Sequence, residues 1–546
     1  MAQISLSNLT VLIKKEKEHL FHFDKINKMK KRYFLTIILG TILLSNCTKK
    51  LETFPGDSLG REDLSSLQGV KLLSTGIYSS LSSGIDKAYN DYHNYSSDDF
   101  AKLNRVNNSE PGLFTTNILD VNNNGVTTWP LWTNCYKNIF TCNTVIAQNK
   151  FGADIENNNA LGELYFLRAY NYFILSNLFT RPYTQMNISN LGLPLRLDPN
   201  DKTEAKRSMI NELYTQMIDD LKISAFYLKS ISTDRTRASK QAAHALLARI
   251  YNSMLDPATP DVTMANNAIN YADSVLNSGK ASMITASDLF FGNNTVVRTQ
   301  WPSGTKHYFA TASSSSETIW MLYRTAVTTL PLCLDNGYNQ LKAGQYLPIS
   351  NDYYTILNKY PTDLRNNLID KSYTTATGTI LSSADATYNA KSTNCNKYSF
   401  QGGINNLGST IVLRATEMRL IQAEAYAKLG NTAKALENIN YVRSRAGVPT
   451  FTAANWTTNS YNIKNILDLV LNERRLEMIG ECQRTRDVYR NKKDMMRAYR
   501  FDGDNYLEIF PAGMASTVSR WDSKQIIRPI PYGQMLQSSA MVQNPY

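Results

Sequence analysis

The feature that most limits the fold of this chain is a series of segments with helical periodicity. Apolar residues recur at spacings of three and four over 65–82, 129–149, 209–229, 239–256 and 263–278. Because an α-helix has 3.6 residues per turn, this spacing places them along one helix face. Leu161 to Phe179 is apolar most of the way round, so we expect a helix there that is buried on several sides.

Helical order returns in two segments near the C-terminus, 411–429 and 432–446. Gly430 and Asn431 separate them, and Gly447 is a typical C-terminal stop. Two helices within about 36 residues, with small residues at their contacts, are similar to a tetratricopeptide unit, as is the pair within 239–278. The sequence therefore predicts a mainly α fold with tetratricopeptide-like helix pairs as its scaffold.

We expect a single domain at 61–546, with the helical scaffold at about 61–278 and 411–500. Between these blocks, 279–410 lacks helical periodicity and consists of short polar runs mixed with aromatic residues. Long irregular excursions inside a helical protein usually carry recognition. We interpret 279–410 as a loop-rich ligand-binding insertion, with a purely structural subdomain as the alternative.

The N-terminal part of the chain contains a secretory leader. Met29 and three basic residues precede the apolar run Tyr33–Leu44, which is followed by Ser45-Asn46-Cys47. This run is too short to cross a bilayer core of about 30 Å. We interpret 29–46 as a lipoprotein signal peptide and Cys47 as the lipidated first residue of the mature protein, although Asn46 departs from the usual small residue. A retained anchor helix is the alternative.

Two segments flank this leader. Residues 1–28 are polar and lysine-rich, and we interpret them as a wrongly assigned upstream extension. Residues 47–60 contain Pro55 and two glycines, as expected of a tether. The first 46 residues hold eight Lys or Arg and three Asp or Glu, so the formal net charge falls from +12 to +7 over the remaining 500 residues. Without a block of like charges, this balance argues against nucleic-acid binding.

The sequence offers little for catalysis. Gly56-Asp57-Ser58-Leu59-Gly60 matches the nucleophile-elbow pattern, but Pro55 precedes it and the buried strand that an elbow needs is missing. Asp98 and Asp99 could be imagined as a glycosidase acid pair, but neighbouring side chains point in different directions, and we expect a solvated pair. The spacing of the cysteines and histidines predicts no metal site, and no cofactor-binding motif is present. We therefore expect no enzyme.

Charged residues are concentrated on the C-terminal helical segments, where they lie among packing positions. Charge on a packing face must be paired, so we predict a structural salt-bridge network between helices rather than an acid-base site. Its members are Arg414, Glu417, Glu424, Arg443, Glu473, Arg474, Glu477, Glu481, Arg484 and Asp487.

With these residues the chain resembles the SusD/RagB family of nutrient-binding outer-membrane lipoproteins. Arg414, Glu417, Ala423-Glu424-Ala425, Asn440 to Arg443 and Arg445-Ala446-Gly447 stand where that family has its first helical signature. Glu473-Arg474-Arg475, Glu477, Glu481, Arg484 and Asp487 match a second signature, in which Cys482 replaces the usual Gly. Shorter agreements occur in the same order from Phe166 to the terminal Gln543-Asn544-Pro545-Tyr546.

The resemblance implies a helical scaffold under irregular ligand-binding insertions. It also implies a lipid-anchored protein of the outer membrane, at the cell surface, that pairs with a TonB-dependent transporter of the SusC-like type. The ligand would be a glycan or another small nutrient, bound without catalysis. The alternatives are a lipid-anchored hydrolase of the same nutrient and a helical-repeat scaffold that contacts only proteins.

An aromatic platform edged by polar groups suits a sugar, which has apolar ring faces and hydroxyl edges. The chain holds 32 tyrosines, a residue that combines an apolar ring with a polar tip. The candidate ligand-binding residues are Tyr89, Tyr92, Tyr95, Trp301, Trp320, Tyr323 and Tyr338. Core packing is the alternative role for each of them.

Overall fold

A computed structural model describes residues 63–100, 128–186, 190–289, 308–325, 349–370, 373–374, 380–381, 394–395, 397, 401, 407–498 and 516–544. The chain divides into Met1–Ser66 and Leu67–Tyr546, and the fold described below is that of the second unit. Cys47, the leader and the tether lie outside the described residues, as do Trp301 and Tyr338.

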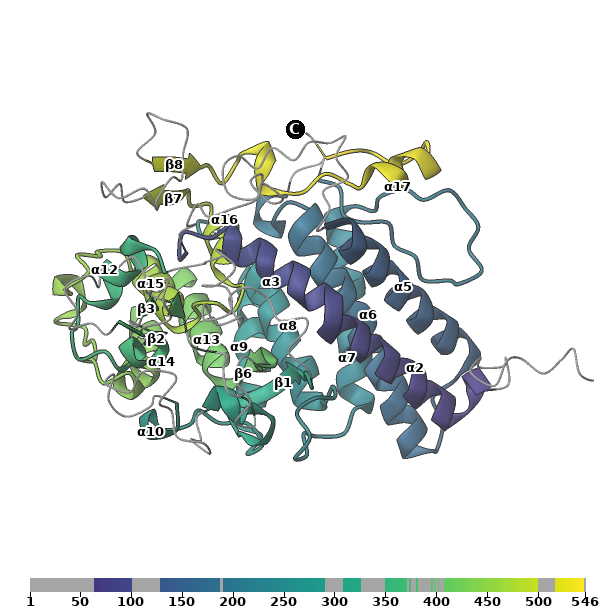
Figure 1. Ribbon diagram of the computed structural model, residues 1–546, viewed down its shortest axis with the longest axis horizontal. Coiled ribbons are helices and arrows are strands. Elements are labelled where there is room, and N and C mark those ends of the chain that lie inside the picture. Colours follow the sequence, from purple (N-terminus) through teal and green to yellow (C-terminus); the bar gives the residue numbers. More distant parts are fainter. Residues whose placement is uncertain are drawn as a thin grey trace, which may run out of the picture. The chain divides into compact units, whose positions relative to one another are not determined.

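The second unit is mainly helical, as predicted (Figure 1). Its N-terminal helices are α2 (Leu67–Ser80), α3 (Asp86–Tyr95), α5 (Thr128–Gln148), α6 (Ile155–Phe179), α7 (Ile210–Tyr227), α8 (Lys240–Met254) and α9 (Val262–Leu276). A π-helical turn, Leu81–Ile85, joins α2 to α3. The later helices are α10 (Ala286–Leu289), α12 (Asn351–Leu357), α13 (Ala415–Lys428), α14 (Thr432–Arg445), α15 (Ile466–Glu477), α16 (Arg484–Arg490) and α17 (Tyr532–Gln537).

The helices pack mostly against their neighbours in sequence. Helix α6 contacts α5 and α7, α8 contacts α7 and α9, and α13 contacts α14 and α15. Helix α9 also packs against α13, although a long stretch of chain separates the two helices in sequence (Figure 1). The two predicted helix pairs, α8–α9 and α13–α14, therefore stack on each other. Among the described helices, none combines the length and apolar character required to cross a membrane.

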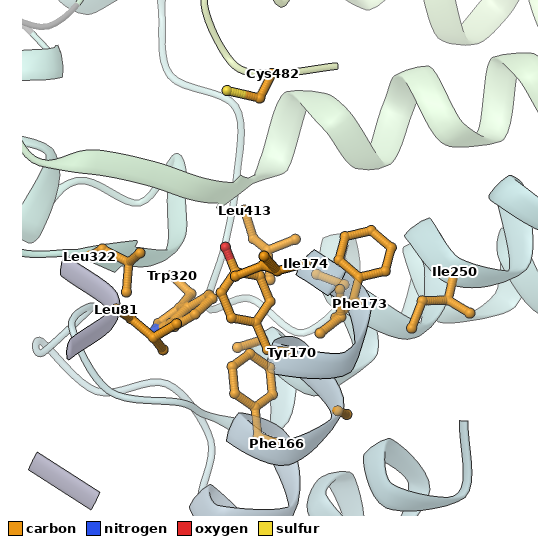
Figure 2. Packing of buried hydrophobic residues seen from close by; sticks show 14 of the residues in the cluster. Leu81, Phe166, Tyr170, Phe173, Ile174, Ile250, Trp320, Leu322, Leu413 and Cys482 are labelled. Atoms are coloured by element: carbon orange, nitrogen blue, oxygen red, sulfur yellow. The ribbon is translucent and has the colours of Figure 1, made fainter. Parts of the chain in front are cut away.

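Helix α6 is the centre of the main core. Of its 25 residues 18 are buried, which agrees with the apolar character that the sequence shows on nearly all its sides. Its rings Phe166 and Tyr170 meet the Trp320 ring edge-on, at centroid distances of 4.8 and 4.7 Å (Figure 2). Asp154 caps the helix by accepting hydrogen bonds from the backbone N–H groups of Glu156 and Asn157.

The described strands form four antiparallel pairs. They are β1 (Thr318–Leu322) with β6 (Thr410–Arg414), β2 (Ile369–Asp370) with β5 (Asn394–Cys395), β3 (Tyr373–Thr374) with β4 (Ile380–Leu381), and β7 (Met495–Ala498) with β8 (Ser516–Ser519). In the longest-range pair Trp320 lies opposite Leu413, and Leu322 lies opposite Thr410. Every residue of β1 is buried, so this pair belongs to the core.

Three helix boundaries differ from the prediction. Helix α6 begins at Ile155, earlier than the expected Leu161. Ile411 to Arg414 belong to β6 and not to a helix, because this short β-branched run pairs with β1 and the helix starts only at Ala415. The charged segment from Glu473 to Asp487 is not one helix. It is interrupted after α15 by Gly480 and Cys482, whose φ angles are +74° and +59°, and α16 begins at Arg484.

Candidate functional site

A pocket lies where the ends of several helices meet. Helices α3, α6, α7, α8 and α16 and the C-terminal segment around Ile526 each contribute to its wall. Its cavity volume is about 50 Å³, and about 640 Å³ of space lies in and in front of it. We call it the His93 pocket, because the buried imidazole of His93 forms part of its lining.

Hydrogen bonds between distant segments hold the wall of the His93 pocket together. His93 Nδ1 lies 2.6 Å from the Thr485 hydroxyl, which links α3 to α16. The loop after α6 is bound to α16 as well, since Thr184 donates to the Arg490 carbonyl at 2.7 Å and Gln185 donates to the Tyr489 carbonyl at 3.1 Å. The pocket is therefore a product of the tertiary fold.

The lining combines aromatic rings with neutral polar groups. The tyrosines are Tyr92, Tyr183, Tyr214 and Tyr489. The small polar residues are Ser96, Ser176, Asn177, Thr180, Ser253 and Thr485. Tyr183 is half-buried and packs at 4.9 Å against the buried Tyr214 ring, which leaves part of its own ring open to solvent. Such a lining can contact both an apolar ring face and hydroxyl groups.

His93 is neutral at physiological pH. Only 3% of its surface is exposed, and burial, together with the charges of Arg486 and Arg528, holds the pKa of His93 well below its usual range. Its Nε2 atom has no hydrogen-bond partner in the described part of the chain. A neutral imidazole can donate a proton from only one ring nitrogen, so His93 offers one donor and one acceptor.

The predicted ligand-binding residues are dispersed in the structure. Tyr92 lines the His93 pocket, and Tyr89 lies behind it, where its hydroxyl accepts hydrogen bonds from Asn177 and Arg486 at 3.1 and 3.4 Å. Trp320 has no exposed surface and belongs to the core (Figure 2), whereas Tyr323 follows β1 and is 43% exposed. The side chain of Tyr95, at the end of α3, lies outside the description, like Trp301 and Tyr338.

Sequence reasoning missed most of the pocket. Arg486, Thr485 and Tyr183 were not among the candidates, and His93 looked isolated because its partner is 392 positions away. The only signal that pointed to this region was the cluster of tyrosines on α3.

A second hollow, of about 230 Å³, lies between α15 and α16 and is also lined by the segment that follows α16. Its lining includes Asp468, Asn472, Arg475, Arg484, Asp487 and Lys493, and no aromatic residue. It therefore lacks the flat apolar face that a sugar ring contacts, and we do not treat it as the ligand site.

All ten residues of the predicted salt-bridge network form buried or partly buried ion pairs. Arg414 contacts Glu317, Glu477 and Glu481 at 3.1, 2.9 and 2.9 Å, so one guanidinium on β6 joins the residue before β1 to α15 and to the turn after α15. The remaining seven also pair with opposite charges and are Glu417, Glu424, Arg443, Glu473, Arg474, Arg484 and Asp487.

These arginines determine the protonation of the buried glutamates. Burial alone would raise the pKa values of Glu417 and Glu477. Arg249 and Arg474 beside Glu417, and Arg445 and Arg414 beside Glu477, outweigh burial and lower each pKa to about 2. Both carboxylates are therefore ionised at neutral pH.

The prediction of a solvated Asp98-Asp99 pair is wrong. The two residues are 5% and 2% exposed, because Arg484 and Arg475 bind them. Arg484 Nε lies 2.7 Å from Asp98, and Arg475 Nε lies 2.7 Å from Asp99. Burial would raise the pKa of Asp98, but the charges of Arg484 and Arg475 hold it well below its usual range. Asp98 therefore serves as an ion-pair partner.

Two family models match the chain, in order and without overlap. A model described as the SusD family matches residues 336–546, and a SusD-like model described as "Starch-binding associating with outer membrane" matches residues 57–252. No curated protein matches the chain.

Solved structures show the same fold at low sequence identity. A SusD superfamily protein from Bacteroides thetaiotaomicron is 21% identical, with a TM-score of 0.66, over 88% of this chain and 100% of that one. A SusD superfamily protein from Bacteroides vulgatus is 20% identical, with a TM-score of 0.67, over 88% and 99%. A SusD-like carbohydrate-binding protein from Bacteroides vulgatus is 16% identical, with a TM-score of 0.64, over 87% and 97%.

Proposed function

This chain belongs to the SusD/RagB family, and we propose that it is a lipid-anchored, non-catalytic protein that binds a glycan at the cell surface and delivers it to a partner TonB-dependent transporter of the outer membrane. The observation that carries this proposal is the match of two models of one family at the two ends of the chain. One of these models is described as starch-binding and associated with the outer membrane.

The chemistry of the His93 pocket supports binding without catalysis. Tyrosine rings and neutral amide and hydroxyl groups can hold a saccharide through ring contacts and hydrogen bonds. Within the described ranges, no group of three or more His, Cys, Asp or Glu could hold a metal ion. The adjacent carboxylates that were considered as an acid pair, Asp98 and Asp99, are both engaged by arginines.

A membrane anchor would compensate for a shallow site. One small polar pocket gives modest affinity, whereas confinement beside a transporter raises the effective concentration of the captured ligand. We propose Cys47 as the acylated residue, and residues 47–60 as the tether that allows the folded domain to reach the barrel.

Isolation of the tagged protein from its own membranes in mild detergent tests the partnership. We expect a TonB-dependent barrel to co-purify, and the isolated complex to bind saccharides from a glycan panel. A complex that contains the barrel but binds no saccharide would indicate a protein-only scaffold. Release of shortened saccharides by the purified protein would indicate a hydrolase. Either result would contradict the proposal.

A further inference from the structure

The positive charge in the His93 pocket is not balanced within its wall. Three arginines line the pocket, Arg181, Arg486 and Arg490, and no Asp or Glu is among the lining residues. Arg490 has its own counter-charges, because it binds Glu424 and Asp487 at distances of 2.6 and 2.7 Å. Arg181 and Arg486 therefore decide the electrostatic character of the pocket.

Arg486 has no carboxylate partner among the described residues. Its Nη1 donates to the Tyr89 hydroxyl at 3.4 Å, and its guanidinium lies 4.5 Å from the centre of the Phe173 ring. Among the described residues, these two contacts leave most of its five N–H donors without a partner. The charge of Arg486 also acts on groups in the pocket wall. Burial raises the pKa values of Tyr89 and Tyr214, and Arg486 lowers them. Burial lowers the pKa of His93, and Arg486 lowers it further.

Arg181, at the rim of the pocket, likewise has no carboxylate within ion-pair distance among the described residues. Its Nη atoms donate to the Gln185 side chain and to the backbone carbonyls of Asp522 and Ser523, which are neutral acceptors. The carboxylate of Asp522 is paired with Arg520. The half-buried Arg181 guanidinium donates to neutral acceptors, and the charge of Asp522, which Arg520 binds, acts on it from further away. An anion that enters the mouth therefore gains attraction from both arginines.

The size of the cavity limits what can enter it. One water requires roughly 10–15 Å³ of such volume, so a cavity of about 50 Å³ holds about three to five waters. This is room for a small charged group and not for a pyranose ring. The ring itself would remain at the mouth, where the half-buried Tyr183 offers an aromatic face.

We propose that the His93 pocket receives the anionic substituent, a carboxylate or a sulfate ester, of an acidic saccharide. Arg486 provides paired N–H donors for the anion, as guanidinium groups do for carboxylate and sulfate oxygens. His93 and Thr485 line the same pocket as further polar groups. This inference rests on the proposed saccharide-binding function, and names the class of ligand that the site prefers.

Calorimetric titration of the full chain with matched pairs of saccharides tests the inference. One pair is an oligogalacturonide and its methyl ester, and a second pair is a sulfated disaccharide and its unsulfated form. Inorganic sulfate serves as the free anion. We expect one acidic member to bind at least about tenfold more tightly than its neutral counterpart, with a preference that weakens as salt is added. The pair that shows this preference distinguishes the carboxylate from the sulfate.

Variants locate the effect. Arg486→Gln should weaken binding of the acidic saccharide about tenfold and leave the neutral one unchanged, whereas Arg486→Lys should keep part of the preference. Arg520→Gln is the matched control, because Arg520 is an arginine paired at the surface, outside the pocket lining. If Arg486→Gln does not fold, Arg181→Gln on the rim provides the same comparison.

Four results would overturn the inference. If acidic and neutral saccharides bind equally, the inference fails and the proposed function remains. The same holds if no variant of a pocket arginine changes the binding of the acidic saccharide. Binding of inorganic sulfate without any saccharide would show an anion site of another kind. If no saccharide of either class binds, the inference and the proposed function both fail.

Discussion

Cys482 has a backbone conformation that glycine adopts more easily than any other residue. Its φ angle is +59°, in the left-handed region, two positions after Gly480 with φ +74°. The resemblance to the SusD/RagB signature places a glycine at this position, and the backbone gives the physical reason for it. The thiol partly compensates, because it is buried and lies 2.7 Å from the Asn90 side-chain oxygen.

We therefore expect an unusual order of stability at this position. Cys482→Gly and Cys482→Ala both lose the thiol, but only glycine relieves the left-handed strain, so the Gly variant should be more stable than the Ala variant by about 1 kcal/mol. Urea unfolding of the two variants measures this difference.

Lys222 in the middle of α7 provides the control. It is exposed and helical, and there Lys222→Gly should be less stable than Lys222→Ala by about 1 kcal/mol. If the Ala variant is the more stable one at Cys482 too, the φ angle does not control stability at this position.

Only some residues of the His93 pocket could be predicted from the sequence. Tyr92 could be proposed because it belongs to a visible cluster of tyrosines, but the same criterion selected Trp320, which is buried in the core. Side-chain chemistry does not distinguish a ring on a surface from a ring in a core. Nothing in the sequence singled out Arg486 as a ligand-binding residue. Its proposed role depends on the lack of a carboxylate in the pocket lining, and only the folded chain shows which residues form that lining.

At the scale of elements, periodicity predicted the helices well and their ends less well. The long helices α5 to α9 lie within a few residues of the predicted ranges, apart from the earlier start of α6, because many turns contribute to each pattern. The strand β6 was missed because its partner β1 lies about 90 residues earlier, and a short apolar run fits a helix or a strand equally well.

The buried ion pairs should make the arrangement of these elements sensitive to the loss of a single charge. Arg414→Met would leave Glu317, Glu477 and Glu481 without their common partner, and we expect a loss of about 3–5 kcal/mol in the free energy of unfolding. The matched control is Arg520→Met, because Arg520 is 66% exposed in its pair with Asp522, and its loss should change stability far less than the loss of Arg414. Denaturant unfolding that gives equal losses would show that the Arg414 pairs contribute no more than a surface pair.

The same pairs predict instability in acid. The pKa values of Glu417 and Glu477 are about 2 in the folded protein, below the value of about 4.3 expected for an unfolded glutamate. The folded state therefore binds fewer protons, so this stabilisation is present above about pH 4.3 and is lost as the pH falls toward 2. Urea midpoints measured from pH 7 to pH 2.5 should decline steeply below pH 4.3. A flat profile would contradict the assignment of these carboxylates as buried, ionised partners.

At the scale of the whole molecule, the order of the motifs predicted the family and the helical scaffold. The ligand was harder to infer, because a saccharide site depends on the relative placement of loops and helix ends that no short motif encodes. In the His93 pocket, α3 and α16 meet through residues almost 400 positions apart.

The proposed lipid anchor can be tested separately from saccharide binding. Cys47→Ala should move the protein from the membrane fraction to the soluble fraction, abolish labelling with radioactive palmitate and leave saccharide affinity unchanged, because the anchor is not part of the folded domain. Labelling that persists in the variant would contradict the assignment of Cys47 as the acylated residue.

The most direct measurement of saccharide binding without chemistry is an equilibrium titration followed by recovery of the ligand. The full chain is titrated with the tightest saccharide of the panel, held at saturation for many hours, and the saccharide is then released and weighed by mass spectrometry. We predict saturable binding at one site and recovery of the saccharide with its mass unchanged. A ligand recovered in shortened form, or the lack of saturable binding by any saccharide, would contradict the proposed function.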